Sequence, residues 1–226
     1  MRIDDPAARR AFLRRLAASG ALGAAGLTGL ISRALARGDL PPGVNRLEGT
    51  ATVNGRPAQN GTPVSLGDRV ATGRASQAVI IVNDDAFLMR ADTAIDFQGR
   101  GGVLANMVVA TGKVLSVFSK KPLAIKAATA SIGIRGTGAY LEVEAGRVYF
   151  CLCYGEARID GPGMESRVVK TRHHEAPLVL TESGGIMSAA PGPVVNHTDD
   201  ELILLESYVG RVPDFMSDGT FIGPRY

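Results

Sequence analysis

The sequence predicts an all-β fold, a sandwich or coiled roll of short antiparallel strands that carries one C-terminal α-helix. Twenty-eight glycines and no tryptophan among 226 residues favour many turns and short strands. Short alternating or β-branched runs recur from residue 48 onward, whereas no convincing helical pattern occurs before residue 197. Apolar residues make up 45% of the chain, which is ample for one core. We therefore expect one β domain over residues 48–195, followed by a helix and an extended tail over residues 196–226.

The strands are predicted from these runs and from the turns between them. The clearest turn is Asn54-Gly55, a dipeptide typical of a type I′ hairpin. Thr111-Gly112 is interpreted as another hairpin turn, and residues 173–175 as an interruption within a final strand pair. The predicted strands are residues 48–53, 78–82, 86–90, 93–98, 106–110, 113–118, 123–126, 139–144, 147–154, 167–172 and 176–180.

A glycine-rich stretch and the hairpin after it occupy the middle of the chain. Gly133, Gly136 and Gly138 stand close together, and glycine enters positive φ or tight backbone contact without steric cost. Two strands follow, joined by a turn at residues 145–146. Alternation along the second strand predicts one face with Val148, Phe150, Leu152 and Tyr154, and an opposite face with Tyr149, Cys151 and Cys153.

The helix is predicted to begin after Thr198. Thr198 and Glu201 have the spacing of a capping box, in which the two side chains accept hydrogen bonds from each other's backbone N–H groups. Gly210 is expected to end the helix. Its apolar stripe consists of Leu202, Leu204, Leu205 and Val209. Since only the β domain can bury this stripe, we expect the helix to cover the hairpin face that carries the cysteines.

Two motifs resemble the FecR domain family, the periplasmic modules of iron-dicitrate-type signalling regulators. One is residues 132–137, IGIRGT, preceded by a strand and followed by a hairpin. The other is residues 61–73, GTPVSLGDRVATG, which is similar to the family's G-x-x-V-x-x-G-D-x-V-x-T-G opening. The resemblance covers roughly residues 44–160. The positions of the first motif that carry it are Gly133, Arg135, Gly136 and Thr137.

The resemblance implies a function as well as a fold. In the membrane regulators of this family the domain relays receptor occupancy across the membrane, and a sigma-factor-binding region and a transmembrane helix precede it. Residues 1–36 offer room for neither, so we do not expect signalling through a sigma factor. We expect a binding, interaction or sensory module without catalytic activity, whose partner is an envelope protein or a small ligand. A structural envelope scaffold is a further alternative.

The first 36 residues resemble a twin-arginine export signal. Arg9 and Arg10, with Phe12 and Leu13, match the motif, and a Gly/Ala-rich apolar run follows. A retained membrane anchor is the alternative, but the run of about 16 residues is shorter than the ~20 needed to span a bilayer. We expect cleavage near Ala36, only transient contact with the membrane, a periplasmic location, and a linker over residues 37–47.

The basic charge of the chain comes from this leader. The sequence holds 25 basic and 22 acidic residues, of which six basic and two acidic ones lie in residues 1–36. The rest has 19 basic and 20 acidic residues and is therefore nearly neutral. Because the remaining chain has no net positive charge to attract phosphates, nucleic acid is not expected as a partner.

The sequence contains no phosphate-binding loop, nucleophile elbow or convincing acid–base pair of carboxylates. Its cysteines and histidines, however, all fall within the last 76 residues. Two thiols on one strand face, together with two imidazoles, are a donor set that can hold a metal ion. The residues concerned are Cys151, Cys153, His173, His174 and His197.

Three interpretations of the cysteines stay open. A disulfide suits an oxidising compartment, but residues two apart on a strand lie about 6.5–7 Å apart at Cα, at the limit for a bridge. Alternatively, Cys151 and Cys153 bind a metal or haem iron together with His174 and His197, which would give a redox or sensory protein. In the third interpretation both thiols simply pack as small apolar groups. No cofactor is the default expectation, and a metal ion is the alternative.

The remaining candidates also have ordinary interpretations. Arg135 could bind an anionic ligand, although an arginine in such a loop more often bonds backbone carbonyls. His173 and His174 are predicted to point to opposite faces if their segment is a strand. His197 directly precedes the helix cap, and it would arrive near the cysteines if the helix docks over them.

The export signal can be tested directly. Replacing Arg9 and Arg10 together with lysine should leave unprocessed precursor in the cytoplasm, because the twin-arginine route reads the arginine pair. Cell fractionation and immunoblotting measure the outcome. Normal periplasmic delivery of the double variant would contradict the twin-arginine assignment.

Overall fold

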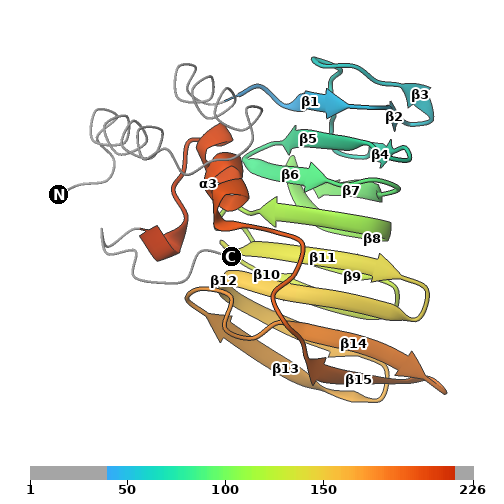
Figure 1. Cartoon of the computed structure of the whole chain (residues 1–226), viewed down its shortest axis with the longest axis vertical. Coiled ribbons are helices and arrows are strands. Elements are labelled where there is room, and N and C mark those ends of the chain that lie inside the picture. The colour runs from blue at the N-terminus through green and yellow to red at the C-terminus, as the bar shows by residue number, and fades with distance from the viewer. Residues whose placement is uncertain (1–39, 217–226) are drawn as a thin grey trace.

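The computed structural model describes residues 40–216, which form fifteen strands, one α-helix and one short 3-10 helix. The predicted fold class is confirmed, since the described chain is mostly β-strand with a single C-terminal α-helix. The strands form one hydrogen-bonded sheet that folds over into two facing layers. Figure 1 shows them stacked from β1 at one end to β15 at the other.

We call the two layers A and B. Neighbouring strands pair antiparallel throughout, except for the parallel pair β8–β9. Layer A contains, in spatial order, β1 (Gly43–Glu48), β5 (Gln77–Val82), β6 (Asp85–Met89), part of β8 (Val103–Val117), β11 (Gly138–Glu144), part of β12 (Arg147–Gly161), β14 (Leu178–Ser183) and β15 (Ile186–Pro191). Layer B contains β3 (Arg56–Pro57), β2 (Ala51–Val53), β4 (Arg69–Thr72), β7 (Ala94–Arg100), the rest of β8, β9 (Leu123–Ala127), β10 (Ala130–Ile134), the rest of β12, and β13 (Met164–Thr171).

The long strands β8 and β12 pass from one layer to the other, and each does so at a glycine. Gly112 has a φ of +94° and Gly155 a φ of +100°, conformations that L side chains rarely adopt. The predicted hairpin turn at Thr111-Gly112 is therefore wrong. Gly112 bends a single continuous strand, so residues 106–110 pair in layer B while residues 113–117 pair in layer A.

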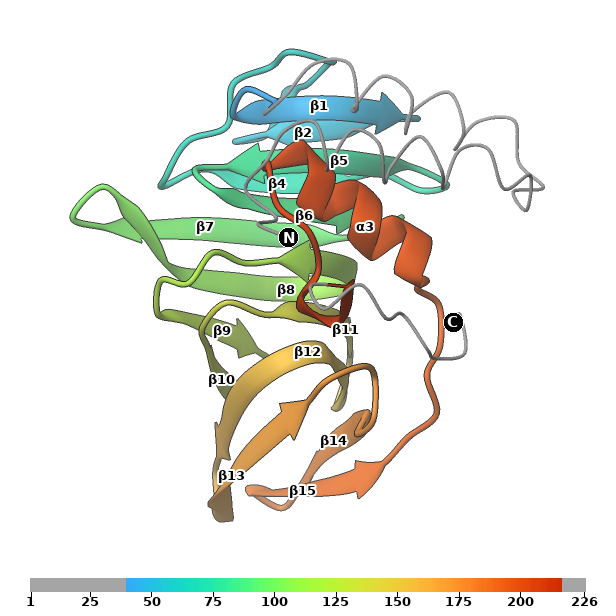
Figure 2. The same ribbon diagram turned by 90° about the vertical axis from the view of Figure 1, so that its left-hand side faces the viewer.

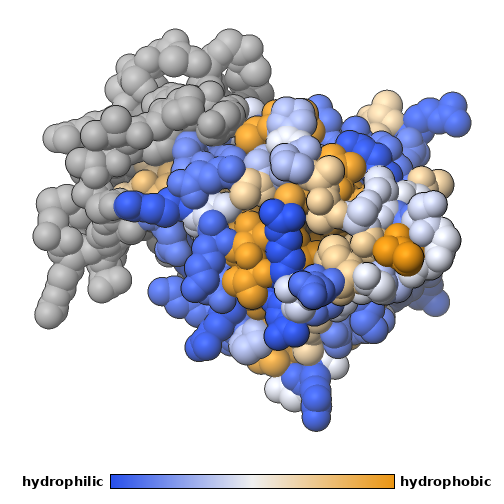
Figure 3. All heavy atoms as spheres, turned by 90° about the horizontal axis from the view of Figure 1, so that it is seen from below, coloured by the Kyte–Doolittle hydropathy of each residue, from blue (hydrophilic) through white to orange (hydrophobic). Residues whose placement is uncertain are grey.

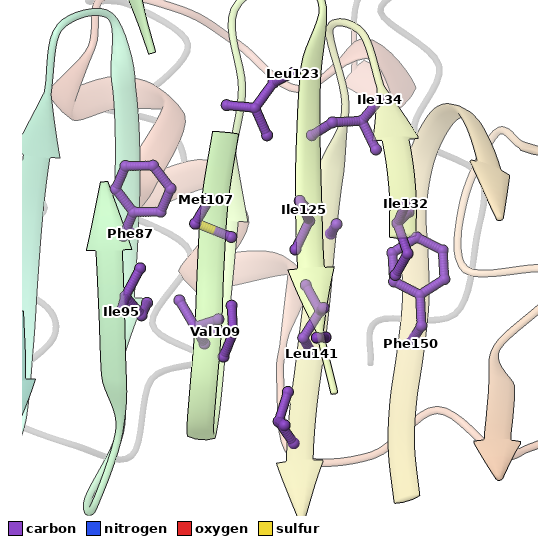
Figure 4. Close-up of a cluster of buried hydrophobic side chains, with 14 of the residues drawn as sticks. Phe87, Ile95, Met107, Val109, Leu123, Ile125, Ile132, Ile134, Leu141 and Phe150 are labelled. Carbon is purple, nitrogen blue, oxygen red and sulfur yellow. The ribbon is translucent and has the colours of Figure 1, made fainter. Parts of the chain in front are cut away.

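The main core lies between the two layers. Inward-facing side chains of both layers meet there in one buried cluster, part of which Figure 4 draws across the strands. This is what alternation along half-buried strands predicts. The labelled members are Phe87, Ile95, Met107, Val109, Leu123, Ile125, Ile132, Ile134, Leu141 and Phe150.

A second core lies on the outer face of layer A, under the helix α3 (Asp199–Tyr208). Figure 2 shows α3 lying across the strands, far in sequence from those it covers. Thr198 caps the helix, and both hydrogen bonds of the predicted capping box to Glu201 are present. Leu202, Leu204 and Leu205 of the predicted stripe are buried here and Val209 is half-buried. The strand side chains that they meet are Val79, Ile81, Leu88, Leu115, Tyr140, Tyr149, Cys151, Cys153 and Tyr154.

Two further expectations differ from the structure. Residues 37–47 were expected to be a linker, but Gly43–Glu48 forms β1, because Val44 is buried in the main core and β5 offers an edge to pair with. The final two predicted strands do not pair with each other. Instead β13 pairs with β12 in layer B, whereas β14 pairs with β12 and β15 in layer A.

The end of the stack formed by β13 and β15 carries apolar side chains at the surface. Val168 is 55% exposed and Ile186 is 60% exposed, and neither belongs to the two cores. Figure 3, which looks at the molecule from below, shows apolar side chains bordered by hydrophilic ones. Charged neighbours of this kind discourage pairing of edge strands between molecules.

The expectations about the leader are not tested by the fold. Arg9, Arg10, Phe12 and Leu13 lie outside the described residues, as does the expected cleavage site. Within residues 40–216, no helix has both the length and the apolar character required to cross a membrane.

The glycine at the second crossing gives a stability prediction. Gly155→Ala should lower the free energy of unfolding by about 2–4 kcal/mol, because positive φ strains alanine and its Cβ would lie 2.6 Å from Thr137 Cγ2. Gly146→Ala is the matched control: φ is +72° there, but a Cβ meets nothing within 4 Å. We expect the control variant to lose about 1 kcal/mol of unfolding free energy. Urea unfolding followed by circular dichroism compares the two, and equal losses would show that the crossing imposes no close contact.

Candidate metal centre

The two cysteines lie together on the outer face of layer A, as strand alternation predicts, and β12 contains a bulge at this point. The register with β11 runs from Ala139 opposite Leu152 to Gly138 opposite Tyr154, which leaves Cys153 as the extra residue. Both cysteines are buried in the cluster under α3, whereas Phe150 and Leu152 face the main core as predicted. Tyr154 was predicted to lie with Phe150. It lies instead with the cysteines, because the bulge shifts the alternation by one residue.

His174 comes from the connection between β13 and β14. It has a φ of +55°, and its backbone N–H donates to the carbonyl of Cys153 at 2.9 Å. This bond ties the connection to the bulge and turns the imidazole inward. As a result, His174 Nδ1 lies 3.5 Å from Cys151 Sγ.

His197 comes from the segment that leads into α3. Its Nε2 lies 3.0 Å from His174 Nδ1, and its Nδ1 donates to the Val195 carbonyl at 2.7 Å. The imidazole stacks on the ring of Tyr140, with centroids 4.6 Å apart and planes 19° apart. A backbone hydrogen bond on one edge and an aromatic ring on one face therefore fix its orientation.

A polar network holds this segment against layer A. Asn196 donates to Glu142 Oε1 at 2.6 Å, and the Tyr140 hydroxyl donates to the same oxygen at 2.9 Å. Burial would raise the pKa of Glu142, but these two donors and Lys113 outweigh it and hold that pKa below its usual value. A charged Glu142 thus anchors Asn196, and with it the neighbouring His197.

Asp199, the first residue of α3, also belongs to the centre. Its Oδ1 accepts from His174 Nε2 at 3.1 Å and from His173 Nε2 at 2.9 Å. Residues 173–175 are not a strand, so His173 and His174 do not alternate between faces: His174 has a positive φ, and both rings reach one carboxylate. Asp199 was not predicted as a site residue, because the helix dipole already explains an acidic residue in the first turn of a helix. Its spacing of two residues from His197 was the available signal.

Four ligand atoms converge at the centre, one each from Cys151, Cys153, His174 and His197, and all lie within 4.8 Å of one another. All four residues are buried. Zinc bonds of about 2.3 Å to sulfur and about 2.0 Å to nitrogen at tetrahedral angles put a sulfur and a nitrogen about 3.5 Å apart, and two nitrogens about 3.3 Å apart. The observed separations of 3.5 Å and 3.0 Å are close to these values.

The hydrogen bonds fix where the imidazole protons lie. His174 Nε2 faces a carboxylate and His197 Nδ1 faces a carbonyl, so both of these nitrogens carry hydrogen. In the neutral rings, the lone pairs of His174 Nδ1 and His197 Nε2 then point at each other across 3.0 Å. Such an arrangement needs a proton or a cation between the two nitrogens. Zinc-binding histidines commonly show this pattern, in which the other ring nitrogen donates to a carboxylate or carbonyl.

The electrostatics of the cluster favour a thiolate beside an imidazolium when no metal is bound. A hydrogen bond from Cys153 lowers the pKa of Cys151 despite burial, and His174 and His197 act in the same direction. Burial would lower the pKa of His174, but Asp199 and Cys151 outweigh it and raise that pKa to about 9. The pKa of Cys153 is raised, by burial first and then by its neighbour Cys151. The lowered pKa of Cys151 therefore favours the thiolate, which is the form that binds metal ions.

The geometry separates the interpretations of the cysteines. Both are free thiols in the structure, so it contains no disulfide between them. Haem does not fit, since the ligand atoms converge within 4.8 Å and the side chains of α3 and layer A close around them. What the arrangement fits is a single ion with four ligands.

The residues of the IGIRGT motif lie elsewhere. Gly136 has a φ of +63° as expected and donates its N–H to the Ser119 carbonyl, and Arg135 Nε donates to the Lys120 carbonyl at 3.0 Å. Arg135 therefore has the ordinary backbone-bonding role, although it also lines an open trough of about 640 Å³ on layer B. Gly133 has no positive φ, and a Cβ there would meet only a carbonyl at 3.9 Å. Thr137 is fully buried.

The chain was compared with known proteins. No protein-family model matches it, and no curated protein sequence matches it. Two crystal structures of a candidate anti-sigma factor from Parabacteroides distasonis ATCC 8503, at 1.65 and 2.50 Å resolution, are similar in part. Their TM-scores are 0.47 and 0.45, and their sequence identities are 9% and 11%. Each match covers 54% of this chain and 59% of the solved chain, so the similarity spans little more than half of either protein.

Proposed function

We propose that this protein is an exported metal-ion-binding module with a regulatory or sensory role, and that it holds one ion with Cys151, Cys153, His174 and His197. The observation that carries the proposal is the convergence of these four buried ligand atoms within 4.8 Å. The proton arrangement supports it as well, because the unprotonated nitrogens of both imidazoles face each other within the cluster. A purely apolar interpretation of the cysteines does not account for that orientation.

The donor set indicates which ions the site suits. Two thiolates and two imidazoles are ligands typical of zinc, and thiolates also favour copper(I). A closed set of four protein ligands leaves no position for a substrate or an activated water. The proposed site therefore binds an ion without performing hydrolytic chemistry, which agrees with a module that has no catalytic role.

The regulatory part of the proposal draws on the two FecR-like motifs. They lie in a different region of the β domain from the metal ligands, so a partner could be recognised there while the ion is held under α3. The partner in this proposal is an envelope protein or a small ligand, and the location is the periplasm. The competing function is that of a structural scaffold. A scaffold would bind its partners equally well with and without metal.

Metal binding can be measured with cobalt(II) as the probe, because cobalt bound by thiolates gives intense charge-transfer absorption. The mature protein, reduced and kept anaerobic, should develop this absorption on addition of cobalt, and zinc should displace it. Cys151→Ser should abolish most of the band by removing one thiolate. Ser116→Ala, an equally buried substitution outside the cluster, should leave it intact. A wild-type protein that gains no band and retains no zinc after dialysis would refute the proposal.

Asp199 should tune the affinity of the centre. Asp199→Asn should weaken zinc binding about 10–100-fold, because the charged acceptor that orients His174 is lost. Asp200→Asn is the matched control: it removes a charge from the same helical turn and costs the same ~0.3–1 kcal/mol of helix-dipole interaction without touching a histidine. Competition with a chromophoric chelator gives both affinities. Equal affinities in the two variants would show that Asp199 does not support the ligand.

A further inference from the structure

We propose that a second metal ion binds beside the first, held by His173, His174 and Asp199, with His174 bridging the two ions through its two ring nitrogens. The inference rests on the proposed function, since the bridging ring is a ligand of the first ion. It goes beyond that function because it adds a site with a different donor set and a different accessibility.

The distances place a second group of ligand atoms directly behind the first. His173 Nε2 and His174 Nε2 lie 2.9 Å and 3.1 Å from Asp199 Oδ1, and the three ligand atoms fall within 4.8 Å of one another. The two imidazoles meet nearly edge to face, with centroids 4.8 Å apart and planes 75° apart. His174 Nδ1 is directed at the cysteines while His174 Nε2 is directed at Asp199, so one ring serves both groups.

Asp199 provides an independent observation. Its side chain is only 3% exposed, and its second oxygen, Oδ2, has no hydrogen-bond partner among the described residues. A buried carboxylate oxygen without a partner is unfavourable, and such groups call for a missing ion or donor. If Asp199 served only to orient the two histidines, Oδ1 alone would suffice, and the buried Oδ2 without a partner would have no explanation.

The chemistry of binding balances without any change of oxidation state. A divalent ion forms a bond to His174 Nε2, and the proton on that nitrogen passes to solvent, which leaves an imidazolate between the two ions. The charges of the imidazolate and of Asp199 together compensate the two positive charges of the second ion. Imidazole and carboxylate are both ligands that zinc, cobalt(II) and copper(II) accept.

The second site is more open than the first. It has three protein ligands instead of four, and the His173 side chain is 14% exposed, whereas those of His174 and Asp199 are buried. Three-ligand sites keep a position for an exogenous group. The group expected there is water or a small anion, so the second ion could exchange ligands with the surroundings while the first stays enclosed.

Cobalt(II) titration of the mature full chain tests the inference, with bound metal counted by elemental analysis after gel filtration. We expect two equivalents in the wild type. The first should bring the thiolate band, and the second should add visible absorption without more thiolate intensity. Coupling through the imidazolate should then weaken the cobalt electron-paramagnetic-resonance signal per ion. His173→Ala should bind one equivalent with an unchanged thiolate band, and His173→Glu, which restores a ligand, should bind two.

The outcomes are distinguishable. A wild-type protein that binds only one equivalent with the full thiolate band would overturn the second site and leave the proposed function standing. Two equivalents retained by His173→Ala would also overturn it, because the second ion would then lie elsewhere. A protein that binds no cobalt and shows no thiolate band would overturn both. Thermal unfolding of each variant verifies that His173→Ala has kept its fold.

Discussion

The docking of α3 on the outer face of layer A is the interaction on which the second core and the candidate metal centre depend. Without the helix, apolar side chains of β5, β6, β8, β11 and β12 would form a large surface patch, which soluble proteins rarely leave uncovered. Polar contacts fix the helix in place: Arg90 pairs with Glu201, and the buried Glu206 accepts hydrogen bonds from Tyr154 and Arg211. The same docking brings His197 and Asp199 to the bulge in β12.

Local sequence was sufficient to predict a structural feature where that feature depends only on residues that are neighbours in the chain. The hairpin of β11 and β12 follows from alternation and a glycine turn, and the Asn54-Gly55 turn adopts the positive φ values that its residues favour. Local sequence was not sufficient to predict the role of Gly112. A glycine with positive φ serves a hairpin turn and a bend between layers equally well, and only pairing with strands distant in sequence selects the bend.

The candidate site shows the same division. Composition alone identified the two thiols and the three imidazoles, and the amphipathic stripe predicted which face α3 would cover. Alternation placed both cysteines on one face, but the positions of the histidines could not be derived from local patterns. They depend on the docking of the segment before α3 and on a left-handed conformation at His174, a position where glycine or asparagine is more usual. The bulge at Cys153 was not predicted either, and it is why Tyr154 joins the same face.

The burial of the centre under α3 has a kinetic consequence. Its ligands come from a strand, a connecting loop and the segment before a helix, and all four are shielded from water. Release of an ion held there requires a local opening of the structure around it, and lifting of α3 from layer A is one such local unfolding event. The residence time of the ion would follow the rate of such opening more closely than the strength of the individual bonds. A partner that binds α3 and stabilises or weakens its docking would then set the rate of metal exchange.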